Sequence, residues 1–363
     1  MTAPPLNFPY IDPDTGQEIV THSMLKSFRR CPRQFFYKYV QRLKPRVEKS
    51  RPLKMGTWMH YLLEEYYAGR DWKAKHLELS RQFRELFDEE QDALGDLPTD
   101  CKRLMLSYLW HYGANKDDPF HGWDVERTEF TIETPLGVGD AIYRGRVDLA
   151  VHDRYGRWFV DHKNMKTFPD FTFRLNDSQS GLYLWAARQE GMEVEGFIWN
   201  YLRTKAPSVP PLLKNGTRLS RAKCDTDYPT LVKAIRGHEL DPEPYRQWLD
   251  VLKADRWQPD TVQTSHFFHR ATLEKDDDML DRVALEAAHT YARMREYDWE
   301  AMDAVERVPD RSCTFMCSFT DLCSAELFQG EAPFLRRQQF KVGDPMDYYT
   351  DDKGKYDTKG EDR

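Results

Sequence analysis

The chain has 363 residues, of which 40% are hydrophobic and 13% aromatic, and its formal net charge is −7 at pH 7. This apolar content is enough for a sizeable core and excludes wholesale disorder. No run approaches the ~18 consecutive apolar residues of a membrane-spanning helix, and the first residues lack the basic and apolar regions of a secretory signal, so we expect a cytoplasmic protein without a membrane partner.

The first third of the chain is predicted to be mostly helical. Residues 1–20 are rich in proline and are expected to form an irregular lead-in. Thr21 or Ser23 can cap a helix that runs to about Arg30, and Pro32 suits the start of the next helix. Three further segments have mixed or helical periodicity and are expected as helices: 55–69, 71–92 and 98–113.

From Val125 the pattern changes to that of β-strands. Three segments are expected as strands, the last two joined by a tight turn at Gly156: 125–133, 141–153 and 157–164. A helix over 178–191 should end at Gly191, and another strand should cover 194–204. A β-meander followed by a helix and a strand, with helices ahead of it, indicates an α/β or α+β core.

The remainder of the chain is predicted to contain a long loop, two helices and a tail. Residues 205–227 are rich in Pro, Lys and Arg and are expected as a basic loop, and helices are expected over about 228–255 and 274–299. Residues 344–363 contain seven acids, four bases and no Leu, Ile or Val. We therefore expect a disordered acidic tail over 341–363.

Positive charge is concentrated in residues 26–54, which contain eleven Lys or Arg and a single acid. Basic side chains can hold phosphates, and aromatic faces can stack on unpaired bases. We expect DNA contacts from four of the basic residues: Arg29, Arg30, Arg33 and Lys38. The interleaved aromatics can equally be core residues of an amphipathic helix pair: Phe28, Phe35, Phe36, Tyr37 and Tyr39.

The strand pair around Gly156 carries a set of residues suited to catalysis. Asp161 and Lys163 are two apart in a strand and share a face, and the hairpin brings Asp148 near them. Two carboxylates suit Mg²⁺ or Mn²⁺, and an adjacent lysine can orient or deprotonate an attacking water. An exposed Asp–Lys ion pair is the alternative, but the apolar run 158–160 before Asp161 disfavours a purely solvated pair.

Four short motifs follow one another along the chain: G-x-x-x-H at 56–60, G-R-V-D at 145–148, V-D-H-K at 160–163 and Q-x-x-x-Y at 179–183. Together with the opening segment 23–40, they resemble the PD-(D/E)XK nucleases of the RecB type over about residues 21–325. The resemblance implies a restriction-endonuclease-like α/β fold, in which helices flank a central mixed sheet. A helical region would precede this core, and a cysteine-containing region would follow it.

The same resemblance implies roles for individual residues. The side chains of His60, Asp148 and Asp161 and the carbonyl of His162 would hold the catalytic metal, and Lys163 would act on the attacking water. Gln179 and Tyr183 would organise the site or contact DNA. Asp161 stands where many members of the family have Glu. Glu126 or Glu129 can serve as an upstream acid, and a solvated strand face explains either of them equally well.

Three of the six cysteines are spaced C-x3-C-x5-C, at Cys313, Cys317 and Cys323. Disulfides are rare in the cytosol, so this spacing favours a metal or a cluster, with Cys31 as the natural fourth ligand. The arrangement resembles that of AddB and of the CRISPR-associated RecB-like exonucleases, in which one Cys before the core and three after it hold a [4Fe–4S] cluster. C-x3-C departs from the frequent C-x2-C spacing, and structural zinc is the alternative. Two cysteines are expected to be structural or incidental: Cys101 and Cys224.

We therefore predict a metal-dependent deoxyribonuclease that hydrolyses phosphodiesters, an exonuclease on DNA ends or single strands in recombination, repair or DNA processing. It resembles stand-alone proteins encoded by bacteriophages and in CRISPR loci. No G-x-x-x-x-G-K-[ST] motif occurs, so unwinding requires a helicase or recombination partner or a frayed substrate. The domain is expected over 21–340, divided as follows: helical part 21–120, catalytic core 121–204, basic loop 205–227, and helical part with cysteines 228–340.

Two other function classes remain open at this point. The first is a non-catalytic DNA-end binding scaffold with an iron–sulfur or zinc site. The intact set of Asp148, Asp161 and Lys163 argues against it, because a pure binder has no need of them. The second is an RNA-binding protein that is held together by a structural zinc ion. It lacks support because the sequence contains no RNA-binding motif.

Overall fold

A six-stranded mixed sheet forms the centre of the computed structural model, in the order β1-β4-β5-β6-β7, with β3 also paired to β4. The structure describes residues 7–47, 50–113, 123–222, 224–254, 267–314, 316–328 and 330–346. The strands of this sheet are β1 (Glu18–Val20), β3 (Asp124–Pro135), β4 (Ala141–Asp153), β5 (Gly156–Met165), β6 (Gly196–Arg203) and β7 (Phe268–Leu273). β3, β4 and β5 form an antiparallel meander, whereas β5 and β6 run parallel.

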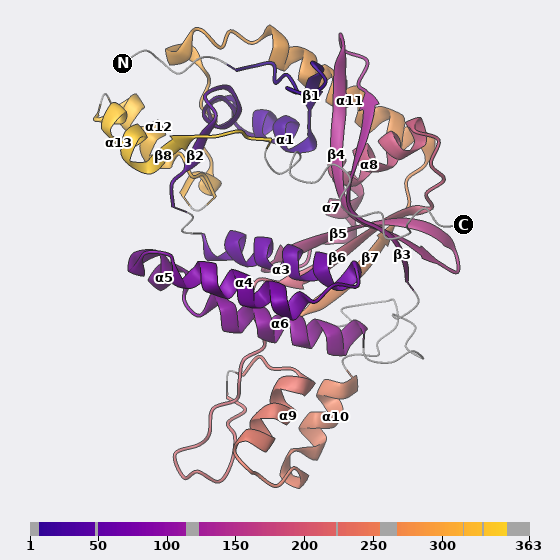
Figure 1. Ribbon diagram of the computed structural model, residues 1–363, viewed down its shortest axis with the longest axis vertical. Helices are drawn as coiled ribbons and strands as arrows, with labels where there is room; N and C mark the ends of the chain where they lie inside the picture. Colours follow the sequence, from indigo (N-terminus) through magenta and orange to yellow (C-terminus); the bar gives the residue numbers. More distant parts are fainter. Residues whose placement is uncertain are drawn as a thin grey trace.

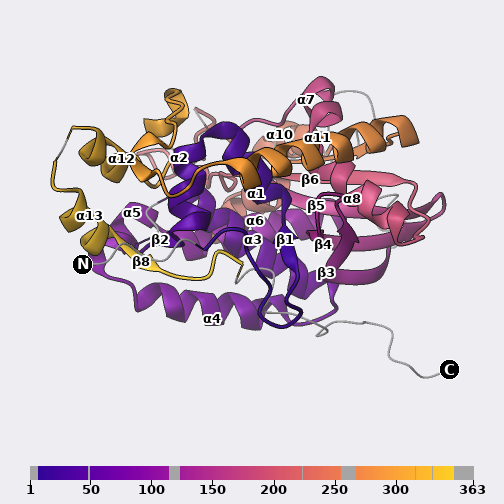
Figure 2. The same ribbon diagram turned by 90° about the horizontal axis from the view of Figure 1, so that it is seen from above.

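Helices cover both faces of this sheet (Figures 1 and 2). The principal ones are α1 (His22–Arg30), α3 (Arg51–Tyr67), α4 (Trp72–Arg84), α5 (Asp88–Leu94), α6 (Leu97–Tyr112), α7 (Phe171–Asn176), α8 (Ser178–Gln189) and α11 (Asp277–Glu296). Along β6, Trp199 packs in one core cluster with α8 and α11, and Leu202 packs in another with α3, α4 and α6. This confirms the expected α/β architecture of a central mixed sheet flanked by helices.

The two ends of the described chain are interlocked beside the sheet. Here α2 (Pro32–Phe35) continues into a π-helix (Phe36–Val40), and two short helices follow from the C-terminal side, α12 (Thr320–Leu327) and α13 (Ala332–Gln339). β2 (Leu43–Pro45) pairs antiparallel with β8 (Phe340–Val342). Tyr37 donates a hydrogen bond of 2.5 Å to Glu326, and Arg33 forms an ion pair of 3.4 Å with the same carboxylate.

The interleaved aromatics of the basic segment belong to the core. Phe28, Phe35, Phe36, Tyr37 and Tyr39 are all buried. Several of them pack around the indole of Trp299, which stacks on the ring of Phe36 with an interplanar angle of 10°. Burial in the core, rather than stacking on bases, therefore accounts for these rings.

A smaller unit with its own core projects from the helical side (Figure 1). It contains α9 (Tyr228–Gly237), a 3-10 turn (Glu243–Tyr245) and α10 (Arg246–Ala254). Its core includes Leu219, whose backbone N–H donates to the Tyr245 hydroxyl at 2.8 Å. The described part of the loop 205–227 is therefore partly packed onto α9 and α10.

Several sequence-based boundaries differ from the structure. The lead-in is not wholly irregular, because β1 pairs in parallel with the start of β4. β7 and α7 lie in segments with no predicted element, and the segment 71–92 is divided into α4 and α5. The tail was predicted from residue 341, yet β8 extends to Val342 and the side chain of Met346 is fully buried. Residues 347–363 of that tail lie outside the described residues.

No helix among the described residues has the length and apolar character needed to cross a bilayer.

The N-terminal segment is attached to the sheet by a buried ion pair. The guanidinium of Arg144 on β4 contacts Asp12 and Glu133, and its side chain is only 1% exposed. Asp12 also accepts backbone hydrogen bonds from Asp14 and Thr15, which fixes the turn before β1. A buried charge of this kind is tolerated only while its partners are present.

We expect Asp12→Asn to lower the free energy of unfolding by about 2 kcal/mol, because Arg144 would lose a charged partner while the turn keeps its acceptor. Urea denaturation followed by circular dichroism measures the difference. Asp14→Ala, on the exposed side of the same turn, is the matched control and should change little. Equal losses in the two variants would contradict the role assigned to the ion pair.

Candidate active site

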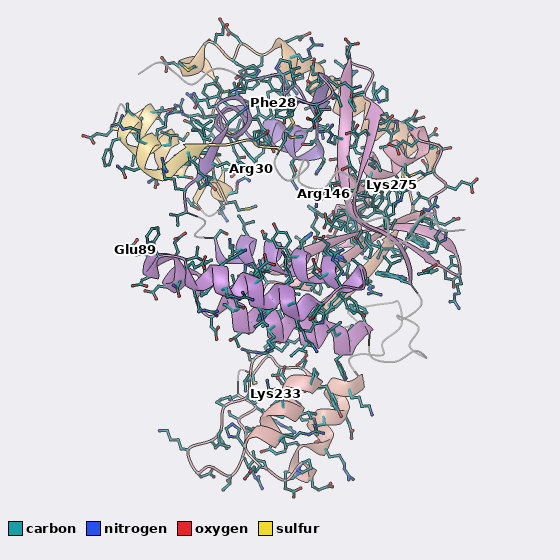
Figure 3. All side chains as sticks on the ribbon, viewed as in Figure 1. Phe28, Arg30, Glu89, Arg146, Lys233 and Lys275 are labelled. Atoms are coloured by element: carbon teal, nitrogen blue, oxygen red, sulfur yellow. The ribbon has the colours of Figure 1, made fainter. Side chains whose placement is uncertain are left out.

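The residues singled out from the sequence motifs converge on one cavity of about 400 Å³. It lies between α1, the π-helix, α3, the β4–β5 hairpin and α8. Its lining includes seven residues of the four motifs, namely His60, Arg146, Asp148, Asp161, Lys163, Gln179 and Tyr183. Lys38 also lines it; Arg146 is labelled on β4 in Figure 3. Segments more than 100 positions apart in the chain thus contribute to one site.

Asp148 is buried and is bound from two directions. Its Oδ2 accepts a hydrogen bond of 2.7 Å from the backbone N–H of His162 and lies 3.3 Å from Nδ1 of His60. Burial acts to raise the pKa of Asp148, but His60, His162, Lys163 and the backbone N–H outweigh it, so the pKa lies below its ordinary value. Asp148 is therefore ionised at neutral pH.

Asp161 and Lys163 form an ion pair on the neighbouring strand, with 2.6 Å between Oδ2 and Nζ. Burial and the negative charge of Asp148 raise the pKa of Asp161 to about 7, although Lys163 opposes the shift. Burial acts to lower the pKa of Lys163, but the two carboxylates outweigh it and the pKa is raised. The two carboxylates therefore differ in basicity, and the lysine stays protonated at neutral pH.

A chain of hydrogen bonds from α8 orients Asp161. Nε2 of Gln179 donates to Oδ1 of Asp161 at 2.8 Å and lies 3.1 Å from the hydroxyl of Tyr183. That hydroxyl donates to the carbonyl of Arg146 at 2.7 Å. Gly145 allows this approach, because a Cβ there would lie 2.7 Å from the Tyr183 ring. The G-R-V-D and Q-x-x-x-Y motifs thus meet through direct contact.

The structure distinguishes between the two candidate upstream acids. Glu126 binds Arg157 through both carboxylate oxygens, at 2.7 and 3.1 Å. Glu129 instead lies across from Asp148, as the flanking register of β3 and β4 requires. Ligand atoms of His60, Glu129 and Asp148 all lie within 4.8 Å of one another. Glu129 is therefore the acid placed to share a metal with Asp148.

Glu129 has an unfavourable backbone conformation, and its carboxylate is buried beside another acid. Its φ is +48°, in the left-handed region that non-glycine residues rarely adopt. Burial and the neighbouring Asp148 raise its pKa well above the ordinary value, although Arg146 lies 2.7 Å away from its Oε2. A bound cation would relieve this repulsion, so the residues fit a divalent metal.

The side chain of His162 belongs to a buried network that the sequence motifs do not reveal. Its Nδ1 lies 2.7 Å from Nδ2 of Asn200, which also donates to the hydroxyl of Tyr108 at 2.9 Å. Tyr67 stacks on the imidazole at an interplanar angle of 13° and accepts a hydrogen bond from Arg270. Burial lowers the pKa of His162 to about 3, so its ring is neutral. Asn200 lies in a predicted strand, but Arg270 lies in β7, which the sequence pattern did not predict, so motif spacing could not reveal this network.

The basic residues predicted to contact DNA have different surroundings. Lys38 is exposed and lines the cavity. Arg29 donates to Thr290 at 2.9 Å, and Arg30 donates to Ser312. Arg33 contradicts the expectation, because it is 3% exposed and its guanidinium binds Glu326 and the carbonyl of Met302. No site role was predicted from the sequence for four of the lining residues: His22, Ser23, Lys26 and Arg146.

The segments that carry the four candidate cluster cysteines adjoin one another. Cys31 follows Arg30, which binds Ser312, the residue before Cys313. The hydroxyl of Thr320 donates to the carbonyls of Cys313 and Cys317. Over the described ranges, no three cysteine thiols lie within 4.8 Å of one another, whereas tetrahedral Zn–S bonds of ~2.3 Å hold thiols about 3.8 Å apart. The described thiols are therefore not arranged as a zinc site.

Comparison with known proteins gives one family match over most of the chain. The sequence model of the PD-(D/E)XK nuclease superfamily matches residues 19–324. One solved structure, described as the crystal structure of SSO0001, is 13% identical, with 85% of this chain and 87% of that chain covered and a TM-score of 0.30. That likeness is too low to support an argument. The search of curated proteins finds no match.

The raised pKa of Asp161 has a consequence for stability. In the metal-free protein Asp161 keeps its proton up to about pH 7, whereas in the unfolded chain it releases the proton near its ordinary pKa of 3.8. The unfolded state therefore binds fewer protons across this interval, and the free energy of unfolding falls as the pH rises. Asp148, whose pKa is lowered, acts in the opposite sense only below about pH 4.

We expect Asp161→Asn to remove this part of the pH dependence. The melting temperature of the metal-free wild type should fall more between pH 5 and pH 7 than that of the variant. Circular dichroism melting in the presence of a chelator gives both slopes. Parallel slopes for wild type and variant would show that Asp161 does not titrate in this range.

Proposed function

The chain belongs to the PD-(D/E)XK nuclease superfamily, a superfamily of metal-dependent nucleases, and we propose that it is a RecB-type exonuclease acting on DNA ends or single strands. The observation that carries the proposal is that two buried carboxylates, Asp148 and Asp161, line one cavity together with the ammonium group of Lys163. A protein that only binds DNA would gain nothing from two mutually repelling carboxylates at this place.

His60, Glu129 and Asp148 are the residues that would hold a divalent cation, with Asp161 and the carbonyl of His162 as further ligands. The first three offer one imidazole nitrogen and two carboxylate oxygens within 4.8 Å. Such a donor set suits Mg²⁺ or Mn²⁺. When bound, the cation would polarise the phosphodiester and lower the pKa of a bound water.

The chain's own residues supply the remaining chemistry. Lys163 stays protonated because its pKa is raised, so its Nζ donates to the attacking water or to a phosphate oxygen and offsets negative charge at phosphorus. Gln179 fixes the carboxylate of Asp161 through Oδ1, which leaves Oδ2 with Lys163. Tyr183 holds α8 against β4 and thereby positions Gln179.

The setting of the enzyme follows from the same proposal. We infer that residues 21–340 act as one nuclease domain of the kind that phages and CRISPR loci encode, in the cytoplasm of a bacterial cell or an infected host. A helicase or recombination partner would supply unpaired ends for DNA recombination, repair or processing. Lys26, Lys38 and Arg146 line the cavity and would attract the phosphate backbone despite the net charge of −7.

Asp161→Ala and Lys163→Ala should each reduce Mg²⁺-dependent degradation of end-labelled single-stranded DNA by at least about 100-fold, because each removes a group at the reacting phosphate. Gel analysis of the products over time, with Mg²⁺, with Mn²⁺ and with a chelator, measures the rates. Lys166→Ala is the matched control, since Lys166 is exposed three positions beyond Lys163 and should retain activity. DNA binding without cleavage under any metal would favour the scaffold alternative instead.

We also propose that Cys31, Cys313, Cys317 and Cys323 hold a [4Fe–4S] cluster. All four are free and half-buried. In such a cluster each thiolate binds a different iron, so three thiols need not surround one ion. The cluster would join the helix end at Cys31 to the segment 313–323, where Tyr37, Arg33 and Glu326 already connect the two ends. Zinc is the alternative occupant and would require the thiols to move closer.

Cys317→Ala should lose iron and lower the melting temperature of the protein, because a cluster that bridges distant segments stabilises the fold. Elemental analysis for iron and zinc after anaerobic purification, together with circular dichroism melting, measures both effects. Cys224→Ala removes a half-buried thiol outside the set and should change neither. Zinc without iron in the wild type would reject the cluster assignment.

A further inference from the structure

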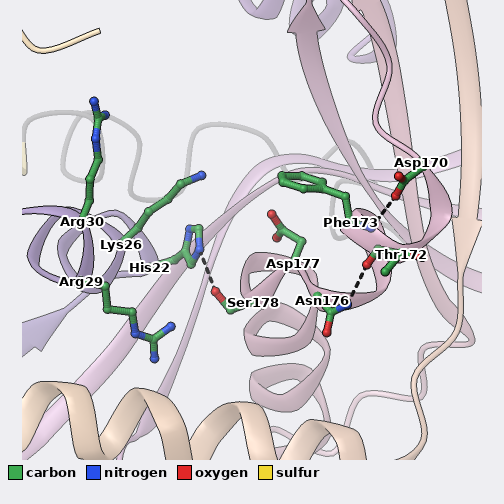
Figure 4. Close-up of a pocket in the computed structure, with 10 residues that line it drawn as sticks. All are labelled: His22, Lys26, Arg29, Arg30, Asp170, Thr172, Phe173, Asn176, Asp177 and Ser178. Atoms are coloured by element: carbon green, nitrogen blue, oxygen red, sulfur yellow. Dashed lines mark hydrogen bonds between the residues drawn. The ribbon is translucent and has the colours of Figure 1, made fainter. Parts of the chain in front are cut away.

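A second cavity, of about 680 Å³, lies next to the candidate active site (Figure 4). Its lining comes from α1 on one side and from α7 and the start of α8 on the other. His22 and Lys26 line both this cavity and the catalytic one. The two cavities therefore adjoin at these two residues, where the imidazole of His22 also lies 3.2 Å from the hydroxyl of Ser178 on α8.

The α1 side of this cavity is basic. Lys26, Arg29 and Arg30 all line it. Arg29 is fixed by its bonds to α11 and Arg30 by its bond to Ser312, whereas Lys26 is exposed and forms no ion pair within the described residues. Cations held at this spacing on one helix suit the phosphates of a nucleic-acid strand.

The opposite side presents an aromatic ring. Phe173 on α7 is 56% exposed, and Figure 4 shows its ring pointing into the cavity toward Lys26. The two acids of this wall cap helices: Asp170 accepts from the N–H of Phe173 at 2.8 Å, and Asp177 accepts from the N–H of Gln179 at 2.8 Å. Among the residues that α7 and α8 contribute to the lining, Phe173 is the one that offers an aromatic face to a ligand.

We propose that this cavity binds a nucleotide of an unpaired DNA strand, with its base stacked on Phe173 and its phosphate held by Lys26. The inference rests on the proposed function, because it assigns the cavity to the strand that the active site cleaves. Stacking on a side chain requires a base with a free face, which unpaired strands offer and the interior of a duplex does not. The cavity therefore selects single-stranded DNA next to the scissile phosphate.

The chain offers a matched control on the same helix. Phe171 is 57% exposed, almost the same as Phe173, yet it is not part of the lining of this cavity. Phe171→Ala and Phe173→Ala therefore each remove one exposed phenyl ring from α7. Only the second removes a ring that faces the proposed nucleotide.

The test measures binding of a fluorescein-labelled 20-nucleotide oligothymidylate by anisotropy in the presence of a chelator, which prevents cleavage. Phe173→Ala should weaken binding about tenfold, Phe173→Trp should restore it, and Phe171→Ala should leave it unchanged. Binding of a blunt duplex should be the same for all four proteins. A series of oligonucleotides should each carry one abasic site at a different position. At one position, the missing base should weaken binding by the wild type but not binding by Phe173→Ala.

The outcomes separate this inference from the proposed function. Equal binding by wild type and Phe173→Ala, or equal losses in the two Phe→Ala variants, would overturn the stacking site even if the protein cleaves DNA. Conversely, the predicted binding pattern in a protein that cleaves no DNA with Mg²⁺ or Mn²⁺ would support the binding site and overturn the nuclease proposal.

Discussion

The repulsion between Asp148 and Asp161, two buried carboxylates in one cavity, is the constraint around which the site is organised. Two negative charges cannot share a cavity of low dielectric without compensation. The compensation is uneven. His60 and a backbone N–H lower the pKa of Asp148, whereas the pKa of Asp161 stays raised, at about 7, even beside Lys163. The remaining parts of the fold bring these compensating groups to the hairpin.

The two faces of the sheet contribute different residues to the site. α3, on one face, carries His60 and also Tyr67, whose ring stacks on the neutral ring of His162. α8, on the other face, delivers Gln179 to the carboxylate of Asp161. The alternation of side chains along β5 separates these tasks, because Asp161 and Lys163 point one way and His162 points the other. A shift of one residue in strand register would exchange the two sets.

The sequence revealed the parts of the fold that depend on local pattern. Strand alternation and helix signals predicted the β3–β5 meander and α8. The order of the motifs along the chain identified four candidate site residues: Asp148, Asp161, Lys163 and Gln179. β1 and β7 were missed because short edge strands are fixed by their partners rather than by their own residues. The choice of Glu129 over Glu126 and the burial of Arg33 also depend on contacts between distant segments, which spacing along the chain does not encode.

The interlocking of the two ends has a consequence for how the protein is made. Tyr37 binds Glu326 from 289 positions away, β2 pairs with β8, and Pro345 lines the same cavity as Lys38. On a ribosome, the N-terminal helices therefore cannot complete these contacts until residues 326–345 have been synthesised. Asp148 and Asp161 are synthesised well before Pro345, so the complete cavity around the two carboxylates can form only after residue 345 has been added.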